Sequence, residues 1–114
     1  MSDLELLELA AKAAGINIDK SPYNGGGIGN TWFDCRGNAV LDWHNGETWN
    51  PLTDDGGAQR LLVSLRLSLI RYALHVMVVD PNRVAVSEDY MADPAVATRR
   101  AIVRAAAEIG KGMK

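Results

Sequence analysis

The chain has 114 residues, of which 47% are hydrophobic and 23% charged, a composition typical of a globular protein that excludes a disordered or collagen-like one. This length suits one core, so we expect a single domain over residues 1–114. The net charge of −2 argues against a protein dedicated to coating nucleic acid.

A first helix is predicted over residues 3–14. Ser2 followed three residues later by Glu5 forms a capping box, and Asp3 favours the positive end of the helix dipole. Apolar residues recur along a broad stripe, and Gly15 stands where a C-cap glycine closes a helix. We expect this helix to be buried on one wide face.

The next segment combines a short alternating stretch with a glycine-rich one. Residues 16–19 alternate like a short strand, whereas residues 21–30 hold four of the eleven glycines and are predicted to form a loop. Bare backbone N–H groups of glycines can cradle a phosphate. Neither the P-loop spacing nor the strand-to-helix setting of a dinucleotide site is present, so a plain loop is the favoured interpretation.

A β-hairpin is predicted for the aromatic-rich segment that follows. Aromatic and β-branched residues flank the turn at 36–38, which indicates paired strands at 31–35 and 39–43. Residues 44–47 are predicted as a further turn that leads to Trp49.

A second helix is predicted to end at about Leu67. Pro51 forces the residue before it out of helical geometry, and Thr53 or Asp55 can cap the helix. Apolar residues then recur at i, i+3, i+4 and i+7.

Gly56 and Gly57 lie in the first turn of this helix, where each costs about 0.5–1 kcal/mol relative to alanine. Either another stretch of backbone packs tightly there, or a partner approaches the helix start. We favour packing, which makes this segment first a structural helix start and second a contact site.

The second half of the chain predicts another hairpin and a last helix. Residues 69–79 are ambiguous at their start and β-like at their end, residues 80–82 form a turn, and residues 83–86 form a strand. Asp93 as cap and Pro94 at the first helical position open the last helix. Its inward-facing residues are predicted to be Ala95, Ile102, Ala105 or Ala106, Ile109 and Met113.

The resulting order is α-β-β-α-β-β-α. Each helix is apolar on one stripe and the strands come in hairpins. The economical solution is an α+β fold in which an antiparallel sheet of about four strands, in two hairpins, packs against three helices.

The segment Trp49–Gly56, WNPLTDDG, followed by an Arg-Leu helix, resembles a segment of small uncharacterised proteins of tailed phages and prophages, here placed with the NinX-like group. Residues 6–15 and 97–110 are similar to their counterparts in such proteins, although an acid often stands at the position of Gly57. The resemblance implies a phage or prophage accessory protein in a bacterial cytoplasm. It implies no activity, cofactor or catalytic residue.

Two further features favour the cytoplasm. The longest strongly apolar stretch, Tyr72 to Val79, is much shorter than the about 20 residues that span a membrane, and the N-terminus lacks the features of a signal peptide. A single cysteine, Cys35, rules out an internal disulfide and fits a reducing compartment. We expect no membrane contact.

No enzymatic, cofactor or metal site is predicted. Asp54 and Asp55 are explained as charges at a helix start, and adjacent helix residues point about 100° apart, which hinders a shared ion. Cys35 has only His44 as a base nearby in the sequence, and His75 lies on a different element. A matched acid, base and nucleophile is missing, so we expect a protein that is not an enzyme.

The leading hypothesis is that the chain binds a host or phage protein. Tryptophans dominate binding hot spots as well as cores, and three of them precede the second helix. The predicted contact residues are Trp32, Trp43, Trp49, Asp54 and Asp55.

The alternative is a nucleic-acid-associated protein that uses Arg99, Arg100 and Arg104 of the basic last helix. Residues 1–57 hold nine acids and three bases, and residues 58–114 hold five acids and nine bases. The oppositely charged halves can pack together, present a basic face to an anionic partner, or support a homo-oligomer.

Overall fold

A computed structural model describes residues 2–18, 33, 36–42, 45–90 and 93–113. Within these residues the helices are α1 (Asp3–Ala14), α2 (Asp55–Ser64) and α3 (Pro94–Lys111). The strands are β1 (Ala39–Asp42), β2 (Glu47–Trp49), β3 (Ser68–Arg71), β4 (His75–Val79) and β5 (Ala85–Asp89). The α+β class is confirmed. The strands form two antiparallel sheets, β1-β2 and β3-β4-β5, where the sequence suggested one sheet of about four strands.

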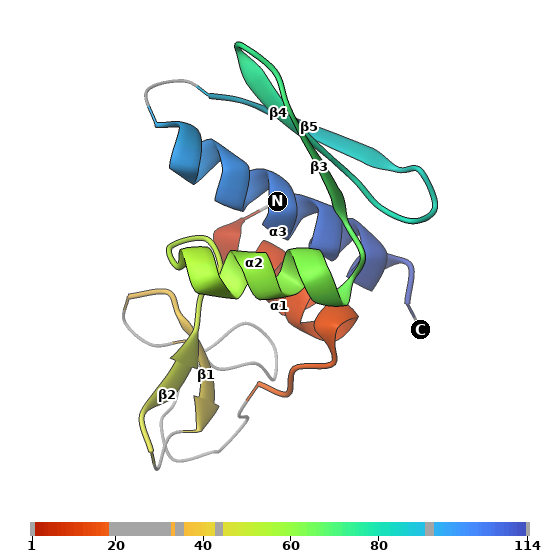
Figure 1. Cartoon of the computed structure of the whole chain (residues 1–114). Coiled ribbons are helices and arrows are strands. Elements are labelled where there is room, and N and C mark those ends of the chain that lie inside the picture. Colours follow the sequence, from red (N-terminus) through yellow and green to blue (C-terminus); the bar gives the residue numbers. More distant parts are fainter. Residues whose placement is uncertain (1, 19–32, 34–35, 43–44, 91–92, 114) are drawn as a thin grey trace.

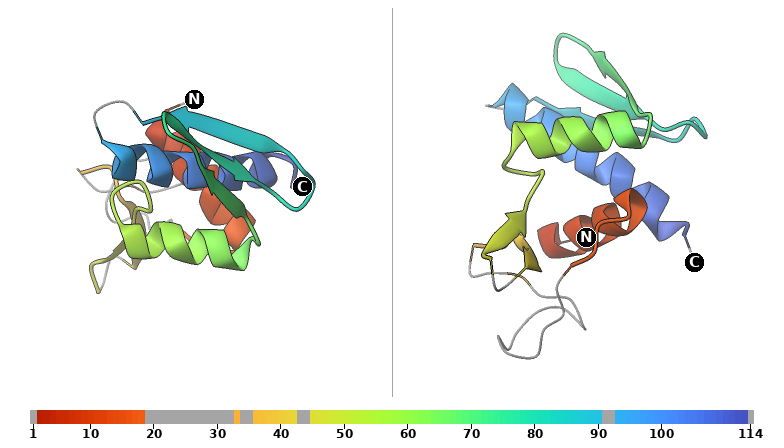
Figure 2. Two further views of the ribbon diagram at one scale, coloured as in Figure 1. Left: turned by 45° about the horizontal axis from the view of Figure 1, so that its top comes forward. Right: turned by 60° about the horizontal axis from the view of Figure 1, so that its bottom comes forward.

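Helix α3 is the centre of the fold. It contacts α1, α2, β4 and β5, and it lies between α1 and the three-stranded sheet (Figure 1). The β1-β2 sheet lies at the end of the molecule opposite the three-stranded sheet, as the second pair of views also shows (Figure 2). The C-terminal ends of α1 and α3 meet, because the Lys12 ammonium of α1 donates to the carbonyl of Met113, which follows α3, at 2.9 Å.

The core forms where α3 faces the sheet. Alternate residues of β4, Val76 and Val78, are fully buried, as expected for a strand with one face against helices. They belong to the same apolar cluster as Ile102 and Val103 of α3. Burying one such side chain contributes about 1.5–3 kcal/mol, so this layer accounts for much of the stability.

Helix α1 has the predicted limits. The Ser2 hydroxyl accepts a hydrogen bond from the Glu5 backbone N–H at 3.2 Å, which satisfies one of the free donors of the first turn. Gly15 ends the helix with φ of 71°, a left-handed conformation that glycine adopts without steric cost. The strand predicted at 16–19 is wrong for residues 16–18, which have no regular secondary structure.

The first hairpin differs from the prediction. Phe33 does bridge Ala39, but the rest of the predicted strand 31–35 lies outside the described residues. The ladder of β1 is made with β2, so the turn predicted to reach Glu47 is too long. Gly46 adopts φ of 68°, and Asp42 accepts from the Asn45 N–H at 3.3 Å, which lets the chain reverse before Glu47.

Helix α2 begins between the two predicted starts and ends earlier than predicted. Its cap is Asp54, not Thr53 or Asp55, because the Asp54 carboxylate accepts from the Gly57 N–H at 3.1 Å. The helix stops at Ser64, before the predicted Leu67. Arg66 has φ of 55°, a left-handed conformation that ends the helical hydrogen bonding.

The ambiguous stretch 69–79 is two strands. β3 and β4 are joined by a tight turn in which the Tyr72 N–H donates to the His75 carbonyl at 2.9 Å. The strand predicted at 83–86 is β5, which runs from Ala85 to Asp89. Because residues 69–79 contain two strands, the expected hairpin is a three-stranded sheet. The predicted turn at 80–82 is present, and Asp80 is its buried anchor.

Helix α3 starts as predicted, with Asp93 accepting from the backbone N–H groups of Ala95 and Val96 and with Pro94 in its first turn. Two residues expected inside, Ala95 and Met113, are exposed, because the buried stripe starts at Ala97 and the helix ends at Lys111.

Candidate protein-interaction groove

A groove lies between α2, β3 and the N-terminal half of α3, with a volume of about 580 Å³. We call it the α2–β3–α3 groove. Its apolar lining is Ala58, Leu62, Leu69, Pro94, Ala95 and Ile102. Its polar lining is Asp55, Gln59, Arg71, Asp93, Thr98 and Arg99. An apolar hollow with a few charged groups around it is the usual form of a binding site.

The register of the sheet explains why β3 contributes to this groove. Arg71 pairs with Val76, which pairs with Glu88, and these three residues therefore share the sheet face that packs on the helices. Leu69 shares that face through its pairing with Val78. Leu69 and Arg71 consequently point toward the helices at the edge where the sheet ends.

The groove brings together Asp55, one of the residues predicted to contact a protein, and Arg99, one of the arginines predicted for nucleic-acid binding. The Arg99 guanidinium donates to the Asp55 carboxylate at 2.7 Å and to the Leu52 carbonyl at 2.8 Å. The Arg99 side chain is only 16% exposed, against 81% for Asp55, so the arginine is held in place and the carboxylate reaches solvent. The pair fixes the start of α2 against α3.

Side-chain hydrogen bonds hold the turn of the WNPLTDDG segment. Asn50 donates from its side chain to the Asn38 side chain at 2.9 Å and accepts from the Leu52 N–H at 3.0 Å. Gly57 is buried, and a Cβ at this position would lie 3.4 Å from the Cα of Pro51. The nearest atom to such a Cβ would be the Asp54 carboxylate oxygen at 3.2 Å, and the backbone of the preceding turn lies beside Gly57 at an ordinary contact distance, so the tight backbone packing that was predicted is not found there. Gly56 is exposed and has no such close backbone contact.

The predicted contact residues do not all meet. Trp32 and Trp43 lie outside the described residues. Trp49 is half-buried and packs against the core, Asp54 caps α2, and Asp55 alone lines the groove. The residues that complete the groove, Leu69 and Arg71, were missed because the sequence leaves the start of β3 ambiguous.

The other two predicted arginines face a different side of α3. Arg100 contacts Asp3 at 2.9 Å and Glu88 at 3.8 Å, and Arg104 forms an ion pair with Glu88 and donates to the Ser87 carbonyl at 3.2 Å. These contacts link α1, α3 and β5. Glu88 was not foreseen as their partner, because the predicted strand ended at residue 86.

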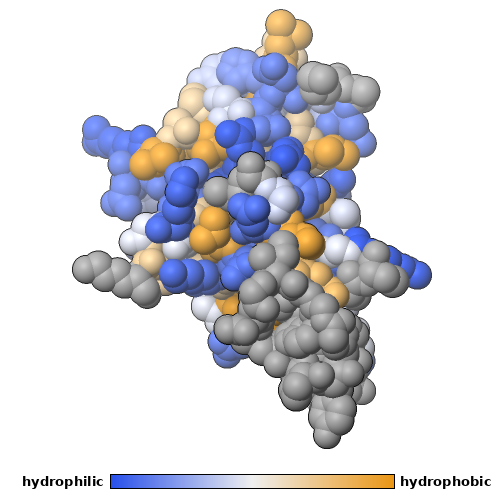
Figure 3. Space-filling model, turned by 180° about the vertical axis from the view of Figure 1, so that it is seen from behind, coloured by the Kyte–Doolittle hydropathy of each residue, from blue (hydrophilic) through white to orange (hydrophobic). Residues whose placement is uncertain are grey.

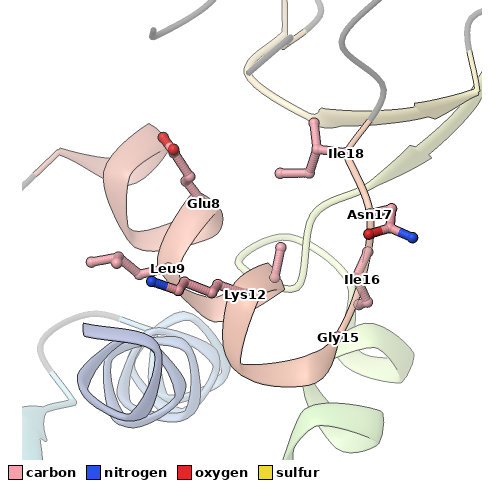
Figure 4. Close-up of a pocket in the computed structure, with 8 residues that line it drawn as sticks. Glu8, Leu9, Lys12, Gly15, Ile16, Asn17 and Ile18 are labelled. Atoms are coloured by element: carbon pink, nitrogen blue, oxygen red, sulfur yellow. The ribbon is translucent and has the colours of Figure 1, made fainter. Parts of the chain in front are cut away.

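Two smaller hollows lie elsewhere on the described part of the chain. One, of about 430 Å³, lies between the C-terminal half of α1 and residues 16–18, and Figure 4 shows Glu8 and Lys12 on its helix side and Ile18 opposite. The other, of about 370 Å³, surrounds the Arg100–Glu88–Arg104 cluster. From behind, apolar residues form small patches separated by hydrophilic ones (Figure 3).

No group of three His, Cys, Asp or Glu residues able to hold a metal ion is found in the described part of the chain. Cys35, His44 and the glycines at 25–29 lie outside it, and His75 stacks on Tyr72 with ring centres 4.5 Å apart. None of the helices in the described ranges is long and apolar enough to cross a membrane. Comparison of the chain with protein-family models, curated proteins and solved structures finds no match.

Proposed function

We propose that this protein is a non-enzymatic accessory protein of a phage or prophage, active in the bacterial cytoplasm, which binds a host or phage protein through the α2–β3–α3 groove. The observation that carries the proposal is the groove itself: apolar side chains from three elements lie beside charged ones. Binding sites for proteins combine an apolar centre with a polar rim in this way.

The resemblance of the Trp49–Gly56 segment to small phage proteins supports the phage setting. The same segment forms one end of the groove, because Asp55 lines it and the Leu52 carbonyl holds Arg99. The residues that carry the resemblance thus contribute to the surface proposed to bind.

Affinity capture from a lysate of infected bacteria, with mass spectrometry of the bound proteins, tests the proposal. Ala95 is exposed and lines the groove, so Ala95→Trp should block it without disturbing the core. The matched control is Val96→Trp at the adjacent position, which is 46% exposed and does not line the groove. We expect one partner to be retained by the native chain and the control and lost with Ala95→Trp.

Nucleic-acid binding is less well supported, because Arg99, Arg100 and Arg104 all contact acids of the same chain. Binding a phosphate backbone would require those ion pairs to be exchanged for new ones. Salt-sensitive retention on DNA that is lost with Arg100→Gln and Arg104→Gln would contradict the proposal in favour of this alternative. Equal capture by the native chain and Ala95→Trp would contradict it as well.

A further inference from the structure

We infer that the partner enters the groove as an extended segment that joins the three-stranded sheet as a fourth strand beside β3. This inference rests on the proposed function and adds the mode of binding and the chemistry of the bound segment. Strand addition to an open sheet edge is a common way to bind peptides, with main-chain hydrogen bonds supplying affinity and alternate side chains supplying specificity.

The first support is the free backbone edge of β3. Among the residues that the structure describes, β3 pairs with β4 alone and stands at the end of the order β3-β4-β5 (Figure 1). The Tyr72 N–H donates to the His75 carbonyl, and hydrogen-bonded pairs alternate along an antiparallel ladder, so Ser68 and Ile70 also bond to β4. The N–H and C=O groups of Leu69 and Arg71 therefore point away from β4, toward the open edge.

The second support is the uncovered helix next to that edge. The sheet packs on α3 through β4 and β5, whereas Ala58 and Leu62 of α2 line the open groove. β3 rises away from the C-terminal end of α2 in both views of Figure 2. A fourth strand beside β3 would extend the sheet across the groove and cover Leu62, which is half-buried, whereas Ala58 is already buried.

The third support is the charge of the groove. Asp55 is paired with Arg99, and the Asp93 carboxylate accepts from two N–H groups of its own helix. Arg71 is exposed and forms no ion pair within the described residues. An acidic side chain on the incoming strand would complement it.

These positions define the bound segment. Leu69 and Arg71 are two residues apart on one face of β3, so the facing side chains of the added strand are also two residues apart. The segment should carry an apolar residue opposite Leu69 and an acidic residue opposite Arg71. Opposite charges that meet across an interface steer association and fix the register of the bound segment.

A second copy of β3 does not have this chemistry. In a symmetric antiparallel pairing through β3, Arg71 would lie opposite Leu67, Leu69 or Arg71 of the other copy, because only residues of the same face are opposed. No acid would then face the arginine. Self-pairing of β3 would thus leave Arg71 without an acidic partner, which favours a segment of a different protein as the occupant.

A library of random octapeptides, selected on the immobilised full chain, tests the inference. We expect enriched peptides to share an apolar and an acidic residue two positions apart and to bind at least about tenfold more weakly to Arg71→Glu. Selection on Arg71→Glu should instead enrich Lys or Arg at the acidic position. The matched control is Arg60→Glu, since Arg60 is exposed on α2 but does not line the groove.

N-methylation of successive residues in an enriched peptide tests the main-chain hydrogen bonds. Methylation at every second residue should weaken binding about tenfold, and methylation at the residues between should have little effect. No enriched pattern, unchanged selection on Arg71→Glu, methylation effects without alternation, or dimerisation of the chain through β3 would each overturn the inference. The proposed function would survive those outcomes if Ala95→Trp still abolished capture of the partner.

Discussion

Gly110 of α3 lies directly against the backbone of Leu9 in α1. A Cβ at position 110 would lie 2.8 Å from the carbonyl carbon of Leu9 and closer still to its oxygen. The two helices can therefore approach this closely only because residue 110 has no side chain. Ala10 and Ala106, both fully buried, continue the close packing with small side chains.

Gly110→Ala should consequently destabilise the protein, although alanine is the better helix former. Helix backbone cannot yield locally, so we expect a loss of about 2–3 kcal/mol in the free energy of unfolding, measured by urea denaturation. The control is Gly112→Ala, whose Cβ would lie 3.7 Å from its nearest neighbour, the Ile109 carbonyl oxygen. Equal stability of the two variants would show that α1 and α3 do not cross in this way.

Arg66 occupies a position that favours glycine. It follows the last turn of α2 with φ of 55°, and the Leu67 N–H donates back to the Leu62 carbonyl at 2.9 Å. Arg66→Gly should therefore raise the melting temperature, with a gain of up to about 1 kcal/mol from relief of the left-handed strain. The same change inside the helix, Arg60→Gly, should cost about 1 kcal/mol. Destabilisation by both variants would contradict the assigned helix end.

Asp80 holds the turn between β4 and β5. The residue is 7% exposed, and its carboxylate accepts from the N–H groups of Asn82 at 2.8 Å and Val84 at 2.9 Å. Asp80→Ala removes the carboxylate oxygen that accepts both bonds, and we expect a loss of about 2 kcal/mol in thermal or urea unfolding. Asp89→Ala, at an exposed residue of β5, should change stability by less than about 0.5 kcal/mol. A small effect at position 80 would mean that the turn keeps its shape without the carboxylate.

Glu88 and Arg104 should be energetically coupled. A double-mutant cycle with Glu88→Gln and Arg104→Gln isolates the pair, and we expect a coupling energy of about 0.5–1 kcal/mol because Glu88 is partly buried. The more exposed pair, Asp3 and Arg100, should give a smaller value. Both couplings should decrease at about 1 M salt, where charges are strongly screened. Coupling that is absent at low salt would contradict the ion-pair network between α3 and β5.

The sequence by itself determined the local features of the fold. The caps Ser2 and Asp93, the closing Gly15, and the turn at Asp80 were all readable, because each depends on hydrogen bonds or backbone angles within a few residues. The α+β class followed from the same signals, since the spacing of apolar residues sets which face each helix or strand buries. The predicted boundaries were wrong by a few residues, as at the cap of α2, and the strand predicted at 16–19 is absent from residues 16–18.

The tertiary structure alone decided which elements meet. The contact of Gly110 with Leu9 and the ion pairs of Arg99 and Arg104 join residues that local patterns do not connect. The tertiary structure also decides that β1 pairs with β2 and that β3 lies at the edge of its sheet. Asp55 and Arg99 were each singled out in the sequence, but their meeting in one groove was not. Local patterns record the preference of each segment, whereas such contacts depend on how all segments together bury the most apolar surface.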